Sequence, residues 1–362
     1  MSDHSNKQKE KYRMQKKLLG RWGVIALAAT LTATVVTGCG SDSEDAAENL
    51  SGTIGIAYSL GGRDVPGFNQ LAYIGVEPLL AANDSLELIE SQDNPTATDD
   101  QRAERLRLMA QKGANPIVVV GFTYAAALAK VAPEFPDTTW GIVDDSSVTA
   151  PNVHSIVFKE EEGSYLVGVA AALKSKSNNV GFIGGVNTPL IAKFEAGFIA
   201  GAKAVNAGIK VQSTYISNFP DFSGFNDPAK GYEAAKGMYE NGADVVYAAA
   251  GGTGTGLHKA ASELGKWSVG VDADEATYPA HADYVTTILT SMLKRVDVGV
   301  AAFVADALAG VDTAGVKTWG FAEGGVGYTT TGGYIDDLTS QIEEYAAKIA
   351  SGDVVVPTDP KA

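Results

Sequence analysis

Residues that form crosslinks, bind metals or act as nucleophiles are scarce in this sequence. Its 362 residues include one cysteine, Cys39, and four histidines, at positions 4, 154, 258 and 281. A single cysteine cannot form an internal disulfide. The histidines are scattered, with no H-E-x-x-H motif and no cysteine partner. The sequence therefore predicts no metal site and no cofactor, and we interpret the last three histidines as structural or surface residues.

Phosphate-binding loops and catalytic serine elbows are also missing. No G-x-S-x-G motif occurs. Residues 248–259, AAAGGTGTGLHK, follow an expected strand, but their glycine spacing fits neither the G-x-G-x-x-G loop nor the P-loop. Gly251 and Gly252 still let backbone groups approach a ligand at a helix N-terminus, with tight packing as the alternative.

Two acidic clusters follow expected strands, at residues 144–145 and 272–274. A catalytic pair of carboxylates needs surroundings that push the two pKa values apart. Binding of ligand hydroxyls or capping of helices is the better interpretation of both clusters. We expect a protein that is not an enzyme.

Basic residues are few and gather at the N-terminus. The chain has 28 Lys and Arg against 43 Asp and Glu, and seven of the basic residues lie within residues 7–21. Residues 22–36 carry no charge, and this run is shorter than the roughly 20 residues of a membrane-spanning helix. A basic segment, a short apolar segment and a small-residue site predict an export signal.

The end of this signal contains the only cysteine. Residues 36–39, VTGC, resemble a bacterial lipobox, in which the cysteine is lipidated and becomes the first residue. We therefore predict a lipoprotein signal peptide at residues 1–38, a lipid anchor at Cys39 and a location on the extracytoplasmic face of the cell membrane. An ordinary signal peptide or an uncleaved anchor helix are the alternatives.

Removal of the signal makes the chain strongly acidic. Residues 1–38 hold seven of the Lys and Arg and two of the Asp and Glu, so the remainder has a formal charge of −20. Such a chain lacks the basic clusters that bind nucleic acid. Residues 39–51 are small, polar and acidic after the cysteine, which predicts a disordered tether.

The rest of the chain alternates short apolar runs with longer helical segments. The runs IVVVG and VVYAAA are apolar on both faces, as in buried parallel strands. The pattern predicts an α/β protein with two doubly wound parallel-sheet lobes joined by a hinge, with a boundary near residues 155–159. We expect an N-terminal lobe of residues 52–156 plus about 285–325. The C-terminal lobe then comprises residues 157–284 plus about 326–352, and the ligand lies between the lobes.

Several stretches, in order along the chain, resemble the basic membrane protein family of surface lipoproteins. These are PGFNQLAYIGV, VFKEEEGSYLVGVAAAL, VGFIGG, IAKFEAGFIAGAKAVN, FNDPAKGYEAAKGMYENGADVVYAAAGGTGTG, GVDAD and TSMLKRVDVGV. The family consists of purine-nucleoside-binding members of the type I periplasmic binding proteins that serve ABC transporters. The resemblance implies that fold, a nucleoside ligand and a permease partner.

The resemblance also implies a set of ligand-binding residues. Phe68 and Phe194 would stack on the two faces of a base, and Asn69 would bond the base edge. Asp272 and Lys294 match the ribose-binding positions of the family. Gly251 and Gly252 would offer backbone groups nearby.

The base-binding end departs from the family pattern. Ser59 stands where members commonly carry an Asp, and Ala126 stands where many carry another. Ser59 remains a candidate ligand-binding residue. Residues 217–228, SNFPDFSGFNDP, form a longer segment than usual and could add an aromatic lid, although loop aromatics commonly pack locally.

The leading hypothesis is thus a lipid-anchored protein that captures a nucleoside and delivers it to an ABC importer. A second hypothesis keeps the scaffold and changes the ligand to a sugar or a modified nucleobase, because of Ser59 and Ala126. A third is a surface receptor or regulator that signals rather than transports.

Overall fold

A computed structural model describes residues 50–361 apart from residues 65 and 95. The predicted signal peptide, Cys39 and most of the predicted tether lie outside these residues. Within the described part, no helix has both the length and the apolar character needed to cross a membrane.

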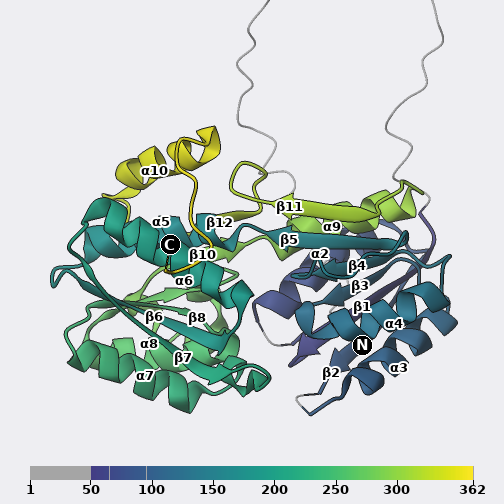
Figure 1. The fold of residues 1–362 in the computed structure, drawn as a ribbon, viewed down its shortest axis with the longest axis horizontal. Helices are drawn as coiled ribbons and strands as arrows, with labels where there is room; N and C mark the ends of the chain where they lie inside the picture. The colour runs from purple at the N-terminus through teal and green to yellow at the C-terminus, as the bar shows by residue number, and fades with distance from the viewer. Residues whose placement is uncertain (1–49, 65, 95, 362) are drawn as a thin grey trace, which may run out of the picture. The chain divides into compact units, whose positions relative to one another are not determined.

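The first lobe is built on a six-stranded sheet with the order β11-β5-β4-β3-β1-β2 (Figure 1). All its neighbouring strands are parallel. The strands are β1 (Gly52–Leu60), β2 (Leu86–Asp93), β3 (Ile117–Val120), β4 (Trp140–Val143), β5 (Val153–Phe158) and β11 (Gly315–Trp319). The helices are α2 (Phe68–Ala82), α3 (Asp99–Gln111), α4 (Ala125–Val131) and α9 (Val296–Leu308), with 3-10 turns η2 (Phe122–Tyr124) and η3 (Ala132–Glu134).

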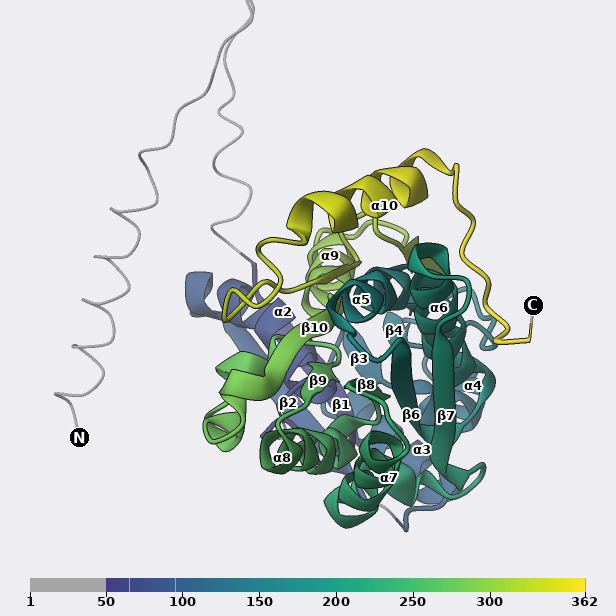
Figure 2. The ribbon, with the colours of Figure 1, turned by 90° about the vertical axis from the view of Figure 1, so that its left-hand side faces the viewer.

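The second lobe has the same plan, in the order β12-β10-β9-β8-β6-β7. Its strands are β6 (Asn179–Asn187), β7 (Lys210–Asn218), β8 (Val245–Ala249), β9 (Trp267–Gly270), β10 (Ile288–Lys294) and β12 (Val326–Tyr328). The helices are α5 (Glu160–Lys174), α6 (Pro189–Val205), α7 (Pro228–Glu240), α8 (Gly254–Leu264) and α10 (Thr339–Ser351) (Figure 2). Short 3-10 turns are η4 (Phe222–Phe225), η5 (Gly251–Thr253), η6 (Glu275–Thr277), η7 (Pro279–His281) and η8 (Val285–Thr287). The edge strand β12 is antiparallel to β10, and the other pairs are parallel.

Strands buried on both faces explain why the sequence folds this way. Every residue of β3, IVVV, and of β8, VVYAA, is buried. Parallel sheets need helices on both faces, and the alternating helices supply them. The prediction of two doubly wound α/β lobes is confirmed.

Glycines in α6 allow it to lie directly against α5. A Cβ at Gly197 would lie 2.1 Å from the Glu161 carbonyl oxygen, and one at Gly201 would lie 2.0 Å from that of Tyr165. No larger residue fits at these two positions without separating the helices. This close contact holds the first two turns of α5 against the second half of α6.

The chain crosses between the lobes three times, after β5, after β10 and after β11. The crossings are bonded together, since Lys159 N donates to Trp319 O at 3.1 Å and Arg295 N donates to Gly325 O at 2.8 Å. We expected residues 285–325 in the first lobe, but β10 pairs with β9 in the second sheet. The side chains of β10 are almost all buried within the second lobe. The chain therefore crosses to the first lobe only at Arg295, after β10 ends.

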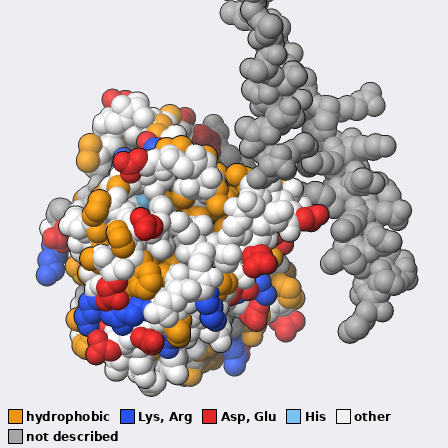
Figure 3. Space-filling model, turned by 90° about the vertical axis from the view of Figure 1, so that its right-hand side faces the viewer, with side chains coloured by type: hydrophobic (Ala, Val, Ile, Leu, Met, Phe, Trp, Pro, Cys, Tyr) orange, Lys and Arg blue, Asp and Glu red, His pale blue; other side chains and the backbone are white. Residues whose placement is uncertain are grey.

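Basic side chains of α3 are paired with acids. Arg102 and Arg105 each bond Asp93 at 2.6 Å, and Arg107 bonds Glu134 at 2.6 Å. On the face drawn in Figure 3, Lys and Arg side chains likewise lie among Asp and Glu. The positive charges of α3 are thus balanced locally by acids.

Candidate functional site

A buried lysine lies where β10 leaves the second lobe. Lys294 is the last residue of β10, and only 2% of it is exposed. Its Nζ lies 2.6 Å from Asp144 Oδ2, beside β4 of the first lobe, and 3.1 Å from Glu160 Oε1, at the start of α5 in the second. One ammonium group therefore bonds carboxylates on both sides of the crossing.

The charges of this cluster depend on one another. Burial on its own lowers the pKa of Lys294, but the carboxylates of Asp144, Glu160 and Asp272 raise it above its ordinary value, so the ammonium stays charged. Burial raises the pKa of Asp144 to about 6, against the opposing pull of Lys294. Burial likewise raises the pKa of Asp272 to about 7.

Three phenylalanine rings surround the same ammonium group. Its Nζ lies 5.2 Å from the ring centroid of Phe68, 5.4 Å from that of Phe158 and 5.6 Å from that of Phe194. Such distances are typical of cation–π contacts. Phe68 begins α2 of the first lobe and Phe194 lies in the first part of α6 of the second. The two predicted stacking residues are thus brought to one point from opposite lobes.

Two of the three acids near Lys294, Asp144 and Asp272, occupy equivalent places in the lobes. β4 and β9 hold the same position in their strand orders; Asp144 directly follows β4, and Asp272 follows β9 by two residues. Both have a left-handed backbone with φ of 66°, which Asp tolerates better than most residues. The Asp272 carbonyl accepts a bond from Lys294 N at 2.9 Å, so the predicted pair of Asp272 and Lys294 is adjacent.

Asn69 and Ser59 are bonded to each other. Asn69 Oδ1 accepts from Ser59 Oγ at 3.0 Å and from Ser59 N at 3.1 Å. Its Nδ2 donates to the carbonyls of Leu60 and Ser59 at 2.9 and 3.3 Å. The amide thus joins the end of β1 to the start of α2, next to Phe68. Its role at a base edge stays a prediction, and these bonds would have to rearrange to allow it.

Gly251 and Gly252 lie in η5 after β8. Gly251 has a φ of 54°, and a Cβ there would lie 3.0 Å from the carbonyl oxygen of Phe225. A Cβ at Gly252 would lie 3.1 Å from Asn226 Oδ1. The contacts therefore place these glycines beside the η4 turn, which supports the packing interpretation, and their ligand-binding role stays a prediction.

Polar atoms around the strand ends have capacity to bond a ligand. Among the described residues, eight buried side-chain nitrogen or oxygen atoms make no hydrogen bond, and they include Thr123 Oγ1, Asp144 Oδ1, Asp274 Oδ1 and Tyr278 OH. Tyr278, from the second lobe, lies close to the first, because its OH is 3.5 Å from the Cβ position of Gly67. Buried polar groups are normally satisfied, so this set fits a polar small molecule.

Sequence reasoning missed part of this cluster. Glu160 is fully buried and bonds both Lys294 and Lys193, the latter at 3.1 Å. Phe158, at the end of β5, was also missed. Asp144 was noted only as an acid after a strand, which was the one available signal. The ligand-binding roles of all these residues stay predictions.

Two doubly wound lobes whose charged and aromatic groups meet at the crossings define a class, the two-lobed solute-binding proteins of type I fold. The sequence model of the Bmp family, described as ABC transporter substrate-binding protein PnrA-like, matches residues 58–359. The chain belongs to this family of substrate-binding proteins, as the resemblance predicted.

Individual relatives agree with this assignment. The chain is 35% identical over 357 residues to the CD4+ T-cell-stimulating antigen of Listeria monocytogenes, covering 93% of this chain and 98% of that protein. It is 31% identical over 366 residues to the ABC transporter nucleoside-binding protein BmpA of Lactococcus lactis, covering 92% and 99%. A crystal structure of an ABC transporter solute-binding protein from Aeropyrum pernix K1 superposes with a TM-score of 0.72 at 25% identity, covering 85% and 94%.

Proposed function

We propose that this protein captures a nucleoside between its two lobes and delivers it to the permease of an ABC importer. The observation that carries the proposal is the meeting of Phe68 and Phe194, from opposite lobes, around the buried ammonium of Lys294. The nucleoside-binding name of the Lactococcus lactis relative supports the same ligand class.

A base and a ribose would use different parts of the cluster. The rings of Phe68 and Phe194 would enclose the base, each stack contributing about 0.5–1.5 kcal/mol beyond the buried area. Asp272 and Lys294 would bond the ribose hydroxyls as acceptor and donor. Because the two phenylalanines come from different lobes, closure of the lobes completes the site, and the protein releases its ligand unchanged.

The base end of the cluster differs from the family pattern and offers few free polar side-chain groups. Ser59 already bonds Asn69, and Ala126 has no polar side-chain atom. Thr123 Oγ1, without a partner, is the polar side-chain group available in the turn after β3. These features keep a sugar or a modified nucleobase as the second candidate ligand on the same scaffold.

Mass spectrometry of the small molecule released when the purified protein is denatured tests the ligand class. We expect a nucleoside bound in near-stoichiometric amount. Release of a sugar alone would favour the second candidate and reject the nucleoside. If nothing co-purifies, titration with a panel of nucleosides and sugars makes the same decision.

We further propose that Cys39 is lipidated and holds the protein on the extracytoplasmic face of the membrane. The short apolar segment before VTGC and the acidic segment after it support this. Cys39→Ser should abolish incorporation of labelled fatty acid and move the protein from the membrane fraction to the soluble fraction. Unchanged membrane attachment of the variant would reject the anchor. Neighbouring permease and ATPase genes would favour transport over a signalling receptor.

A further inference from the structure

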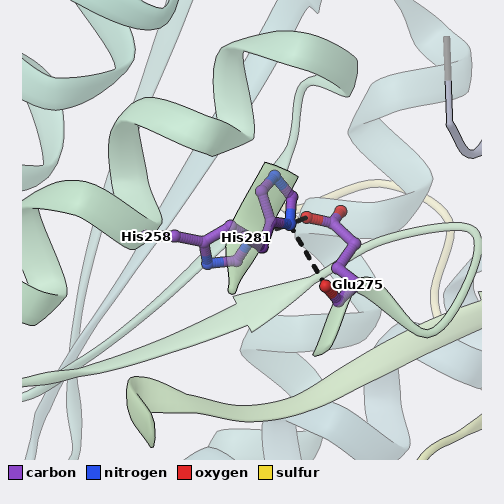
Figure 4. Close-up of side chains that lie close together, drawn as sticks. All are labelled: His258, Glu275 and His281. Atoms are coloured by element: carbon purple, nitrogen blue, oxygen red, sulfur yellow. Dashed lines mark hydrogen bonds and ion pairs between the residues drawn. The ribbon is translucent and has the colours of Figure 1, made fainter. Parts of the chain in front are cut away.

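A second cluster of functional groups lies in the second lobe, apart from Lys294. His258 of α8, Glu275 of η6 and His281 of η7 converge in the core (Figure 4). Exposed fractions are 0% for His258, 6% for Glu275 and 5% for His281. One ligand-type atom from each lies within 4.8 Å of the other two. No local motif predicts this cluster, because the two histidines are separated by a strand and two loops.

The hydrogen bonds around the cluster place a proton or a metal ion between His258 and Glu275. Ser268 Oγ donates its only proton to Thr287 O at 3.2 Å, so at its 2.8 Å contact with His258 it must accept. We therefore assign a proton to His258 Nδ1. The other ring nitrogen, Nε2, then faces Glu275 Oε2 at 2.6 Å. A nitrogen lone pair and a carboxylate oxygen at this distance repel each other unless a proton or a metal ion joins them.

His281 provides a third ligand, and either of its ring nitrogens can carry the proton. Its Nδ1 lies 3.6 Å from Glu275 Oε2 and 3.2 Å from the Glu275 carbonyl oxygen. Its Nε2 lies 3.1 Å from Thr255 Oγ1. A hydroxyl both donates and accepts, so Thr255 can partner either tautomer of His281. The proton can move to Nε2 and leave Nδ1 free to bind a metal.

We propose that His258, Glu275 and His281 bind a divalent transition-metal ion, with Zn²⁺ as the best fit. Two imidazoles and one carboxylate suit zinc, and hard cations such as Mg²⁺ and Ca²⁺ require oxygen ligands. Ligands about 2.1 Å from a tetrahedral zinc lie about 3.4 Å apart. The 3.6 Å pair meets this spacing, and the 2.6 Å pair must open by less than about 1 Å.

The surroundings match those of protein zinc sites. Each ligating group has an outer partner: Ser268 for His258, Thr255 for His281, and Val271 N for Glu275 Oε1 at 2.9 Å. Such partners orient ligands and raise metal affinity. Three protein ligands leave a fourth position for water, as in sites with an open coordination position.

An entry route lies next to the cluster. A cavity of about 450 Å³ between α7 and α8 is lined by Thr255, Gly256 and Tyr284, among others. Thr255 bonds His281, and Tyr284 N donates to the His281 carbonyl at 2.8 Å. The cluster is therefore one side chain away from this cavity. Bound metal would fasten the loop that carries Asp272 to helix α8, whatever ligand the lobes take.

Calorimetric titration of the purified full chain with Zn²⁺, after removal of metals by chelator, tests the proposal. We expect one tight Zn²⁺ per chain. His258→Gln and His281→Gln should each weaken this binding by at least tenfold. His154→Gln, in the first lobe, and Glu263→Gln, on the same helix as His258, should leave it unchanged. Any Zn²⁺ bound elsewhere on the chain contributes equally to the titrations of all four variants, so it does not affect the comparison between them.

Two measurements keep the test decisive if the core variants fail to fold. Co²⁺ added to the unchanged protein should give the strong visible absorption of four-coordinate cobalt, and Zn²⁺ should remove it. Thr255→Val, at the edge of the cavity, should weaken Zn²⁺ binding by about 10–100-fold. The proposal is overturned by no saturable Zn²⁺ binding, by equal Zn²⁺ binding in the histidine variants, or by the weak spectrum of six-coordinate cobalt alone.

Discussion

Replacement of Asp272 by Asn should stabilise the ligand-free protein and weaken ligand binding. The folded pKa of Asp272, about 7, lies above its ordinary value of 3.8 because burial disfavours the charged form. A carboxylate with a raised pKa costs no stability below the unfolded pKa, and the cost grows as the pH rises toward the folded pKa. A tenfold difference in proton affinity between the folded and unfolded states corresponds to about 1.4 kcal/mol. Because the side chain is only half-buried, we discount the full shift. We expect the difference in free energy of unfolding between the variant and the unchanged protein to change by about 2–3 kcal/mol between pH 5 and pH 8.

Urea unfolding of the ligand-free protein and of Asp272→Asn across this pH range measures the effect. The variant should gain stability relative to the unchanged protein as the pH rises, and the difference should be smallest at pH 5. Asp336→Asn, on an exposed acid in the same lobe, is the control and should show no such trend. A stability difference that does not change with pH would refute the reasoning about buried charge. In the same variant, nucleoside affinity should fall at least tenfold, since the ribose loses its charged acceptor.

Three further outcomes follow from the geometry. Lys294→Met removes the cation from two buried carboxylates and should destabilise the protein by about 3–5 kcal/mol in urea unfolding; a loss below about 1 kcal/mol would contradict the cluster. Phe68→Leu keeps apolar area but loses stacking, so calorimetry should show nucleoside affinity about 2- to 12-fold weaker; an unchanged affinity would remove Phe68 from the site. Gly197→Ala forces α6 away from α5 and should lower Tm strongly, whereas Gly237→Ala, with open space around its Cβ position, should leave Tm equal or higher.

Much of the fold was predictable because its signals are local. Apolar runs such as IVVV mark strands buried on both faces, and the helices between them follow from their spacing. The lobe to which β10 belongs could not be predicted from local signals. Its sequence, ILTSMLK, fits either sheet, and only pairing with β9 decides which. The Gly-rich residues 311–334 contain two short edge strands that the sequence did not predict, β11 in the first sheet and β12 in the second.

The candidate site was predictable where a residue has an equivalent in the other lobe or a match in the family. Phe68 begins the helix after the first strand of its lobe, Phe194 lies in the second turn of the equivalent helix, and the structure brings both to Lys294. Glu160 was not predictable, because acids in the first turn of a helix are usually exposed groups that favour the helix dipole. In the folded chain it is completely buried and pairs with Lys193 of α6 and with Lys294, both distant in the sequence.

The histidine cluster illustrates a second limit. His258 and His281 belong to no local motif, and the sequence predicted structural or surface roles for them. The chain between them runs through β9 and then comes back to α8, where Thr255 bonds His281. Gly270 lets Glu275 pack directly against β9, since a Cβ there would lie 3.0 Å from two Glu275 carbons and 2.6 Å from Ser291 Oγ. Only the folded chain reveals that three metal-ligating groups meet.

Calorimetric titration with a ribonucleoside and its 2′,3′-dideoxy analogue tests the central claim most directly. In the proposed complex the ribose hydroxyls bond Asp272 and Lys294, and the base lies between Phe68 and Phe194. We expect saturable binding of at least one ribonucleoside at one site per chain, with the dideoxy analogue at least tenfold weaker. Absence of binding by every nucleoside, or equal affinity for the two forms, would contradict this claim.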